Sequence, residues 1–321
     1  MSEGPAAMKS KSAGPTVFID GEAGTTGLEI RERLARLPAI AVRSIDAARR
    51  KDADARLSLM REVDLVVLCL PDEAAKEAVA LAAGLGADAP RLVDASTAHR
   101  VSTGWVYGFA ELAKDQAAAI RSARRVANPG CYPTGAIALL RPLVDAGFLP
   151  ADYPVTVNAV SGYSGGGKSM IEAYEVKKTG PSFELYGLGL EHKHVPELMA
   201  YAKLSRRPIF VPSVGNFRQG MLVSIPLHLD TLPSRPALAD LEAALVAHYK
   251  DAEMVKVVPL SEAAKSGGRI AAEALNDTDM LELRVFGNAA HRQAVLVARL
   301  DNLGKGASGA AVQNIRLMLG V

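Results

Sequence analysis

The sequence predicts an α/β protein with two unlike halves, a doubly wound parallel sheet followed by an α+β domain with a mixed or antiparallel sheet. In the first half, short apolar segments such as TVFID and VDLVVLCL alternate with helical patterns such as DEAAKEAVALAA. Continuous apolar strands are covered on both faces, which is typical of parallel sheets flanked by helices. After about residue 150, the alternating segments MLVSIPLHL, LELRVF and AVLVARL indicate strands with only one buried face.

The order of these elements predicts the domain boundaries. A chain of 321 residues is long enough for two domains, each with its own core. We expect a disordered leader over residues 1–15, in which Met8 is an alternative start. A dinucleotide-binding domain follows over residues 16–130 and is completed by 302–321, and the catalytic domain covers 131–301. The helical pattern that ends the chain is expected to pack back on the first domain.

Composition excludes several classes of function. The net charge is only +2, with acids and bases interspersed, so no charged surface indicates nucleic acid or a membrane as partner. No apolar run approaches the roughly 18 residues that span a bilayer. Two cysteines do not form a disulfide framework, which fits a reducing cytoplasm. We therefore expect a soluble cytoplasmic protein that binds a small molecule.

A glycine loop directly follows the first predicted strand. Gly21, Gly24 and Gly27 are spaced G-x-x-G-x-x-G, with Thr25 and Thr26 between them, and an amphipathic helix begins at once. Small residues here let the backbone approach a pyrophosphate, which the N–H groups of the helix N-terminus stabilise. The loop predicts a Rossmann-type dinucleotide site, and an ordinary strand-to-helix turn is the alternative.

Basic residues end the second predicted strand, where NAD enzymes usually carry an acid. This stretch contains Arg43 and Ser44, followed by Arg49, Arg50 and Lys51. Guanidinium groups suit a 2′-phosphate, so the stretch favours NADP over NAD. A solvated basic turn is the alternative, because two aspartates stand among these residues.

Cys131 lies in the segment ANPGCYPTG, between a turn and a predicted helix. Pro133 is suited to the first helical turn, so the sulfur is expected at a helix N-terminus, where the dipole lowers the pKa of a thiol. Such a cysteine is a competent nucleophile toward a carbonyl carbon. Cys69, inside the apolar run LVVLCL, is instead expected to be buried and inert.

ANPGCYPTG and the upstream IDGEAGTTG resemble the N-acetyl-γ-glutamyl-phosphate reductase family of the semialdehyde dehydrogenase superfamily, particularly its shorter form. The segments LCLPDEAA, VDASTAHR, VSGYSGGGKS, LEHKHVPEL, VGNFRQGM and LDNLGKGASGAAVQN continue the similarity in order. The resemblance implies NADPH-dependent reduction of N-acetyl-γ-glutamyl phosphate to N-acetylglutamate semialdehyde and phosphate, in arginine biosynthesis, through a thioester on Cys131. It also implies a homodimer or homotetramer.

The family motif H-x-H-x-P-E matches His192, His194 and Glu197, and it implies that His194 is the catalytic acid/base. His192 is placed in the substrate site and is the alternative base. A metal site is the competing interpretation of the pair, but we expect no metal because the chemistry needs none. The remaining histidines are expected at the surface or satisfied in the core: His99, His228, His248 and His291.

The substrate carries a carboxylate and a phosphate, which require cationic partners. The matching family segments supply basic and polar candidates for substrate binding: Ser96, Arg100, Asn128, Ser161, Lys168 and Arg218. Many relatives have arginine where this chain has Lys168, so a point charge replaces a planar fork. The resemblance also places Pro71 and Gly162 at the cofactor.

Other classes of protein compete with this hypothesis. Residues 162–169, GYSGGGKS, satisfy the P-loop pattern G-x-x-x-x-G-K-[ST] and would indicate an ATPase or kinase. No clean strand ending in a magnesium-binding Asp follows, since LVSIPLHLD contains Pro226. Aspartate-semialdehyde dehydrogenase and N-acetyl-aminoadipyl phosphate reductase share the cysteine and histidine chemistry. A catalytically dead NADP-binding regulator would not be expected to keep both groups.

Overall fold

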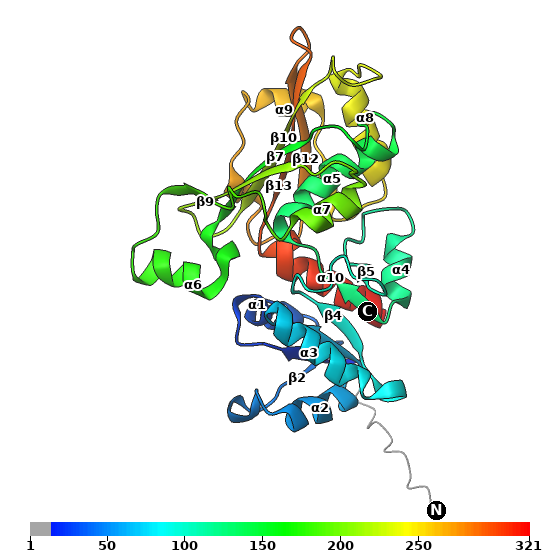
Figure 1. Cartoon of the computed structure of the whole chain (residues 1–321), viewed down its shortest axis with the longest axis vertical. Coiled ribbons are helices and arrows are strands. Elements are labelled where there is room, and N and C mark those ends of the chain that lie inside the picture. The colour runs from blue at the N-terminus through cyan, green and yellow to red at the C-terminus, as the bar shows by residue number, and fades with distance from the viewer. Residues whose placement is uncertain (1–13) are drawn as a thin grey trace, which may run out of the picture.

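The computed structural model describes residues 14–321, arranged as two layers of sheet and helix (Figure 1). The leader predicted for residues 1–15, with Met8, lies outside the described residues apart from Gly14 and Pro15. The N-terminal layer and the red C-terminal helix form one end of the molecule, and the green to orange segments form the other. The predicted fold class is confirmed.

The N-terminal layer is built on a six-stranded sheet in which every pairing is parallel. Its strands lie in the order β2 (Ala41–Arg43), β1 (Thr16–Asp20), β3 (Leu65–Leu68), β4 (Arg91–Asp94), β6 (Arg125–Ala127) and β5 (Val106–Tyr107). Consecutive strands extend away from β1 on both sides. The sheet therefore has a topological switch point beside β1, where ligands of open α/β sheets bind.

Both faces of this sheet are buried, which explains the unbroken apolar strands. In β1, Val17 and Ile19 belong to one core cluster and Phe18 belongs to another. Helices cover the first face: α1 (Thr25–Leu34), α4 (Gln116–Ser122) and α10 (Gly309–Leu319). Helices α2 (Ala53–Glu62) and α3 (Asp72–Ala83) cover the second. The C-terminal helix thus packs on the first sheet, as expected.

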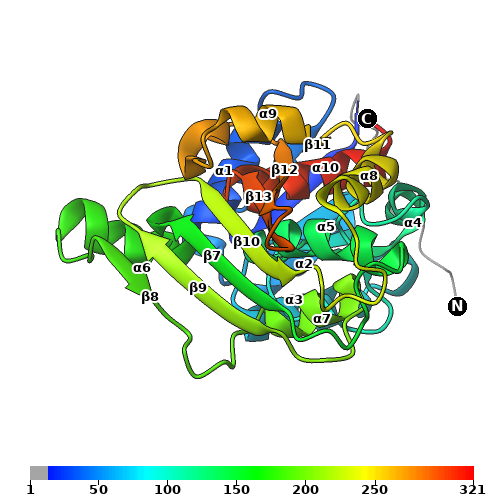
Figure 2. The same ribbon diagram turned by 90° about the horizontal axis from the view of Figure 1, so that it is seen from above.

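The second layer contains a mixed seven-stranded sheet. Its order is β11 (Val255–Val257), β12 (Leu281–Asn288), β13 (Gln293–Leu300), β10 (Met221–His228), β7 (Thr156–Gly162), β9 (Ile209–Gly215) and β8 (Phe183–Leu185). Figure 2 shows β9, β7 and β10 side by side. The helices on its covered face are α5 (Cys131–Asp145), α7 (Val195–Ala202) and α8 (Leu238–Tyr249). Burial alternates along β10, as the sequence pattern predicts.

The carboxyl ends of the parallel strands collect the functional loops at the junction of the two layers. The glycine loop follows β1, Pro71 follows β3, Ser96 follows β4, and Asn128 with Cys131 follows β6. Parallel strands end at the same edge, so these loops lie close together although they are far apart in the sequence. Within residues 14–321, no helix is long and apolar enough to cross a membrane.

Candidate active site

A cavity of about 410 Å³ lies where the two layers meet. Thr25 and Thr26 line it from the N-terminal layer, and Tyr186, which follows β8, lines it from the second layer. The predicted catalytic residues Cys131 and His194 both line it. The cavity also contains several of the predicted binding residues: Arg100, Asn128, Ser161, Gly162 and His192.

Cys131 is the first residue of α5, and Gly130 caps the helix. This is the position that the Pro133 pattern predicts. The side chain is half-buried. Burial raises the pKa of the Cys131 thiol to about 11, against the opposing effects of Arg100 and of the backbone N–H of Tyr132. The expectation of a lowered thiol pKa was therefore wrong, because desolvation outweighs the helix N-terminus.

His194 is buried at the start of α7, and its Nε2 lies 4.0 Å from Oε1 of Glu197. Its Nδ1 has no hydrogen-bond partner within residues 14–321. Burial, aided by the positive charge of Arg100, lowers the pKa of His194 well below its usual value. Burial also lowers the pKa of His192 to about 4. Both imidazoles are neutral at physiological pH, so either can accept a proton.

The two histidines differ in their contacts. The backbone N–H of His194 donates to Nδ1 of His192 at 3.2 Å. The ring of His192 also packs edge-on against Phe210, with centroids 5.1 Å apart. Both rings have aromatic neighbours, since the ring centroid of His194 lies 6.0 Å from that of Tyr132, but Nε2 of His194 is the one that approaches Gly130. A methyl group on Gly130 would lie 2.8 Å from Nε2 of His194.

Glu197 joins the elements around the cysteine turn. Its Oε1 accepts from Nη1 of Arg100 at 2.6 Å, and its Oε2 accepts from the Tyr107 hydroxyl at 2.8 Å and from the Gly130 N–H at 3.1 Å. Arg100 is also buried, and its Nε donates to the carbonyl oxygen of Asn128 at 3.0 Å. The buried guanidinium is thus fixed in the cavity that Cys131 also lines. Glu197 is part of the motif H-x-H-x-P-E, but the motif predicted no role for it.

Asn128, Ser161 and Ser96 are all buried, but their side chains serve local structure. The Asn128 amide donates to the carbonyl oxygen of Ala307 at 3.0 Å and accepts from Asn314 at 3.0 Å. The Ser161 hydroxyl donates to the carbonyl oxygen of Gly162. The hydroxyl of Ser96 donates to Oδ2 of Asp94, which does not line the cysteine cavity. Asn128 and Ser161 therefore meet at the cavity, and Ser96 lies next to it.

Lys168 and Arg218 lie outside the cysteine cavity. Lys168 is exposed and lines a second cavity, of about 250 Å³, beside Gly24 and Gly27 of the glycine loop. The Arg218 side chain is 53% exposed and pairs with Glu175. The structure therefore places one predicted substrate clamp beside the glycine loop and the other at the surface. Arg100 is the predicted clamp that lies in the cavity.

The glycine loop has the backbone shape that the spacing predicts. Gly21 adopts a φ of 90°, and a methyl group there would lie 2.3 Å from the carbonyl oxygen of Cys69. A methyl group on Gly27 would lie 2.6 Å from the carbonyl oxygen of Gly21. Gly21 needs glycine because the loop folds onto the residue that follows β3, and Gly27 needs it because the loop folds onto itself. The other predicted residues of the loop line its cavity: Gly24, Thr25 and Thr26.

The remaining predicted cofactor residues are dispersed. Pro71 caps α3 and lines a further cavity, of about 450 Å³, together with Ser96. Arg43 lies 3.8 Å from Glu62 and Arg49 lies 2.9 Å from Asp52, both at the surface. The Ser44 hydroxyl instead donates to Glu22 of the glycine loop and accepts from Arg31 of α1. Of the predicted basic stretch, Ser44 and Arg50 therefore approach the glycine loop, whereas Arg43 and Arg49 pair with other acids.

Three of the other four histidines have the expected environments, whereas Nε2 of His248 is buried without a hydrogen-bond partner among residues 14–321. Nδ1 of His99 lies 2.5 Å from Oδ2 of the buried Asp94, so it is a satisfied core histidine. His228 and His291 are exposed, and His248 is half-buried on α8. Across residues 14–321, no three histidine, cysteine, aspartate or glutamate side chains are grouped so that they could hold a metal ion.

Two family models match the chain. The "semialdehyde dehydrogenase, NAD binding domain" matches residues 16–120, and the "semialdehyde dehydrogenase, dimerisation domain" matches residues 131–302. The chain therefore belongs to the semialdehyde dehydrogenase family, a class of oxidoreductases. The second match begins at Cys131, the residue that geometry places in the cavity.

The curated relatives that match the chain share the name of one enzyme of this class. The chain is 57% identical over 311 residues to N-acetyl-gamma-glutamyl-phosphate reductase of Brucella ovis, covering 95% of this chain and 99% of the relative. The protein of the same name from Brucella melitensis biotype 2 has the same identity and coverage. The family resemblance stated for the sequence motifs is confirmed. Membership of this family argues against the P-loop alternative for residues 162–169.

Solved structures show the same fold at much lower sequence identity. Aspartate semialdehyde dehydrogenase II of Vibrio cholerae superposes with a TM-score of 0.69 at 16% identity, over 96% of this chain and 99% of its own. The Francisella tularensis aspartate semialdehyde dehydrogenase gives 0.70 at 13% identity, over 94% and 99%. At these identities the likeness supports the architecture alone.

Proposed function

We propose that this chain reduces N-acetyl-γ-glutamyl phosphate to N-acetylglutamate 5-semialdehyde and phosphate with NADPH, in arginine biosynthesis. The observation that carries the proposal is the position of Cys131. It begins α5 in a cavity that also contains Arg100 and His194, at the carboxyl edge of the parallel sheet. The names of the Brucella relatives support the choice of acyl phosphate.

The glycine loop fits a bound dinucleotide. Gly21 and Gly27 leave no room for side chains, and the loop leads directly into the N-terminus of α1 at Thr25. Backbone N–H groups there suit a pyrophosphate. Thr25 and Thr26 line both the loop cavity and the cysteine cavity, which therefore adjoin. When bound, NADPH supplies the hydride that reduces the acyl carbon.

The first step forms the thioester. Because the pKa of Cys131 is raised and that of His194 is lowered, the resting pair consists of a neutral thiol and a neutral imidazole. We infer that the thiol proton passes to His194 as the sulfur attacks the acyl carbon. The new C–S bond replaces the C–O bond to phosphate, and phosphate leaves with the bonding electron pair. The positive charge of Arg100 stabilises the negative charge on the oxygen atoms of the acyl phosphate during this step.

The second step returns the enzyme to its starting state. Hydride addition to the thioester carbon is followed by cleavage of the C–S bond, which releases the aldehyde and a Cys131 thiolate. The imidazolium of His194 then returns its proton to the sulfur. Glu197 fixes Arg100 and the N–H of Gly130 throughout, so the groups around the sulfur keep their geometry.

The binding roles of the remaining residues follow from their positions. We propose that Arg100 binds the acyl phosphate in the cavity that Asn128 and Ser161 also line. Lys168, next to the glycine loop, is better placed to contact the cofactor. Pro71 and Gly162 stay predictions as cofactor contacts.

The assay that tests this function runs the reaction in reverse. With N-acetylglutamate semialdehyde and phosphate, the protein is expected to reduce NADP⁺, which the nicotinamide absorbance reports. Absence of turnover, or equal turnover with aspartate semialdehyde, would contradict the proposal. ATP hydrolysis is expected to be absent.

We also infer self-association and a cytoplasmic location. Alternate residues on the uncovered face of the mixed sheet, such as Val160 and Leu222, are half-buried rather than covered by helices. The family match to a dimerisation domain supports a homodimer formed through this sheet, and a homotetramer is the alternative. Light scattering distinguishes the two. A catalytic free thiol is best preserved in the reducing cytoplasm.

A further inference from the structure

Four segments bring charged and hydroxyl groups together beside the glycine loop. Glu22 belongs to the loop, Arg31 to α1, Ser44 follows β2, and Arg50 follows the short 3₁₀ helix Ala47–Arg49. Oε2 of Glu22 accepts from Nη1 of Arg31 at 2.7 Å and from the Ser44 hydroxyl at 2.9 Å. Nη1 of Arg31 also donates to the Ser44 hydroxyl at 2.5 Å. Nη2 of Arg50 lies 3.7 Å from Oε1 of Glu22.

The partners of this carboxylate are the groups that commonly bind a phosphate. Two guanidinium groups and a hydroxyl surround one anion, and Glu22 supplies that anion from within the chain. The Glu22 side chain is only 13% exposed, whereas Arg31 is 47% and Arg50 is 46% exposed. The carboxylate is therefore the inner member of the cluster, and the two arginines enclose it from solvent.

The position of the cluster matches one part of a dinucleotide. In parallel sheets of this kind the adenosine ribose lies at the end of the second strand, next to the glycine loop. Ser44 marks that end, and Glu22 lies in that loop. A 2′-phosphate on the ribose would need the contacts that Glu22 now makes, and a free 2′-hydroxyl would instead suit the Glu22 carboxylate.

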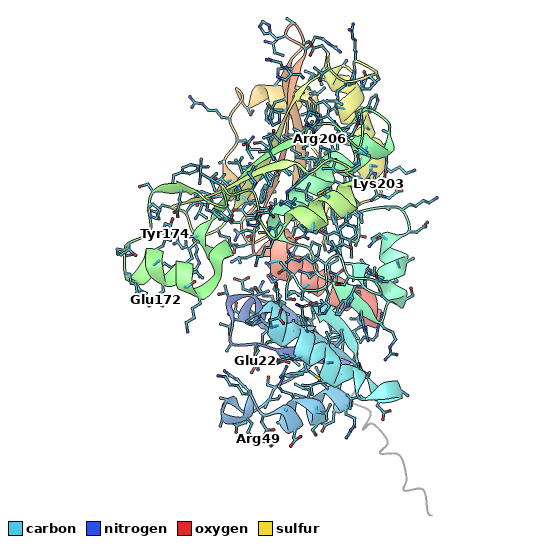
Figure 3. All side chains as sticks on the ribbon, in the orientation of Figure 1. Glu22, Arg49, Glu172, Tyr174, Lys203 and Arg206 are labelled. Atoms are coloured by element: carbon cyan, nitrogen blue, oxygen red, sulfur yellow. The ribbon has the colours of Figure 1, made fainter. Side chains whose placement is uncertain are left out.

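Other basic residues of the same stretch have separate partners. Arg43 lies 3.8 Å from Glu62, and Arg49 donates to Asp52. Figure 3 shows Arg49 at the lower edge of the molecule and Glu22 closer to the junction of the layers. Arg43 and Arg49 thus pair with other acids, and Ser44 and Arg50 are the members of the basic stretch that join the cluster with Glu22 and Arg31.

We propose that Glu22 determines how strongly the enzyme discriminates between NADP and NAD. The carboxylate occupies the site of the 2′-phosphate and must leave Arg31, Ser44 and Arg50 before that phosphate can bind. When Glu22 stays in place, it accepts a hydrogen bond from the free ribose hydroxyl of NAD. The residue thus weakens binding of NADP and supports binding of NAD. This inference rests on the proposed dinucleotide-dependent function.

The test uses the adenosine halves of the two cofactors as probes. Isothermal titration calorimetry measures the affinity of wild type and Glu22→Gln for 2′,5′-ADP and for 5′-AMP. We expect Glu22→Gln to bind 2′,5′-ADP about tenfold more tightly, on the scale of one charge-assisted hydrogen bond. It should bind 5′-AMP no more tightly than wild type. Unchanged affinity for 2′,5′-ADP in a variant with the wild-type unfolding temperature would overturn the inference.

A matched control removes another arginine-paired glutamate of the same domain. Glu62→Gln removes the same charge as Glu22→Gln, but it releases Arg43 from an exposed glutamate at 3.8 Å and leaves Arg31 paired. We expect Glu62→Gln to leave both affinities unchanged. An equal gain in 2′,5′-ADP affinity for the two variants would assign the effect to net charge and overturn the inference. Ser44→Ala should weaken binding of 2′,5′-ADP more than binding of 5′-AMP.

The wild-type measurement separates this inference from the proposed function. If wild type prefers 2′,5′-ADP and Glu22→Gln does not change that preference, the role of Glu22 is wrong and NADPH dependence stands. If neither wild type nor Glu22→Gln binds either nucleotide, the dinucleotide site fails, and both the inference and the proposed function fall with it.

Discussion

Cys131 and Cys69 are the two cysteines of the chain, and they differ less in exposure than in their surroundings. Both are free, both are half-buried, and each lines a cavity at the carboxyl edge of the parallel sheet. Burial raises the pKa of Cys131 to about 11 and that of Cys69 to about 12. Neither accessibility nor burial therefore selects the nucleophile.

Neighbouring charges distinguish the two thiols. Arg100 and a backbone N–H at the start of α5 favour the thiolate of Cys131. Asp94 and Asp20 disfavour the thiolate of Cys69, which stands at the end of a strand without a helix N-terminus. The comparison indicates that a fixed cation, a helix start and a nearby neutral imidazole make a buried thiol useful for catalysis.

The largest expected effect comes from replacing each sulfur. Cys131→Ser should lower turnover by roughly 10⁴-fold or more, since the covalent intermediate is lost, and cofactor binding should be retained. Cys69→Ser, at the other cavity, should keep most of the activity. The reverse assay with NADP⁺ measures turnover, and calorimetry measures binding. Substantial activity in Cys131→Ser would contradict the proposal that Cys131 forms the covalent intermediate.

The next effect concerns the proton acceptor beside Cys131. His194→Ala should lower turnover by roughly 10²- to 10⁴-fold, the usual contribution of a general acid/base. His192→Ala should act mainly on the Michaelis constant of the substrate. Steady-state kinetics of the two variants decide the assignment. A larger loss of turnover in His192→Ala than in His194→Ala would exchange the two roles.

A smaller effect should follow from changing the shape of the cation while keeping its charge. Arg100→Lys cannot hold Glu197 and the carbonyl oxygen of Asn128 with one planar fork. We expect a loss of roughly tenfold to 10²-fold in kcat/KM, together with a lower unfolding temperature, because a buried ion pair is disturbed. Thermal unfolding monitors the second effect. Wild-type kinetics in this variant would argue against a role for the fork.

The smallest expected effect is the difference in thiol reactivity itself. A raised pKa leaves little thiolate at neutral pH, so iodoacetamide labelling of both cysteines should accelerate as the pH rises. At equal pH, Cys131 should react faster than Cys69, because Arg100 and a backbone N–H favour the thiolate of Cys131 whereas Asp94 and Asp20 disfavour that of Cys69. Peptide mass spectrometry of partly labelled protein measures both rates. Faster labelling of Cys69 would reverse the comparison.

Local patterns predicted most of the fold and several of the residues that line the cavity. The glycine loop, the position of Cys131 at a helix start, and the final helix follow from neighbouring residues, so the sequence contains their signals. The hydrogen bonds of Glu197 to Arg100 and Tyr107 join residues 97 and 90 positions apart. No short pattern reports such contacts.

The predictions that failed, and the predicted residues that lie away from the cavity, also depend on contacts that form only in the folded chain. The pKa of Cys131 depends on how much protein surrounds it after folding, whereas the sequence reported only the favourable helix start. Lys168 and Arg218 were placed by motif, but side-chain direction takes one to the glycine loop and the other to Glu175. The cluster around Glu22 escaped notice because it joins four separate segments.

The central claim is that Cys131 carries the acyl group, and trapping that group tests it most directly. Protein incubated with N-acetyl-γ-glutamyl phosphate in the absence of NADPH is digested at low pH and analysed by mass spectrometry. The account predicts one N-acetylglutamyl group on the peptide that contains Cys131, removed by hydroxylamine, and none on the peptide that contains Cys69. An acyl group on Cys69, or none on either cysteine in a preparation that turns over, would contradict it.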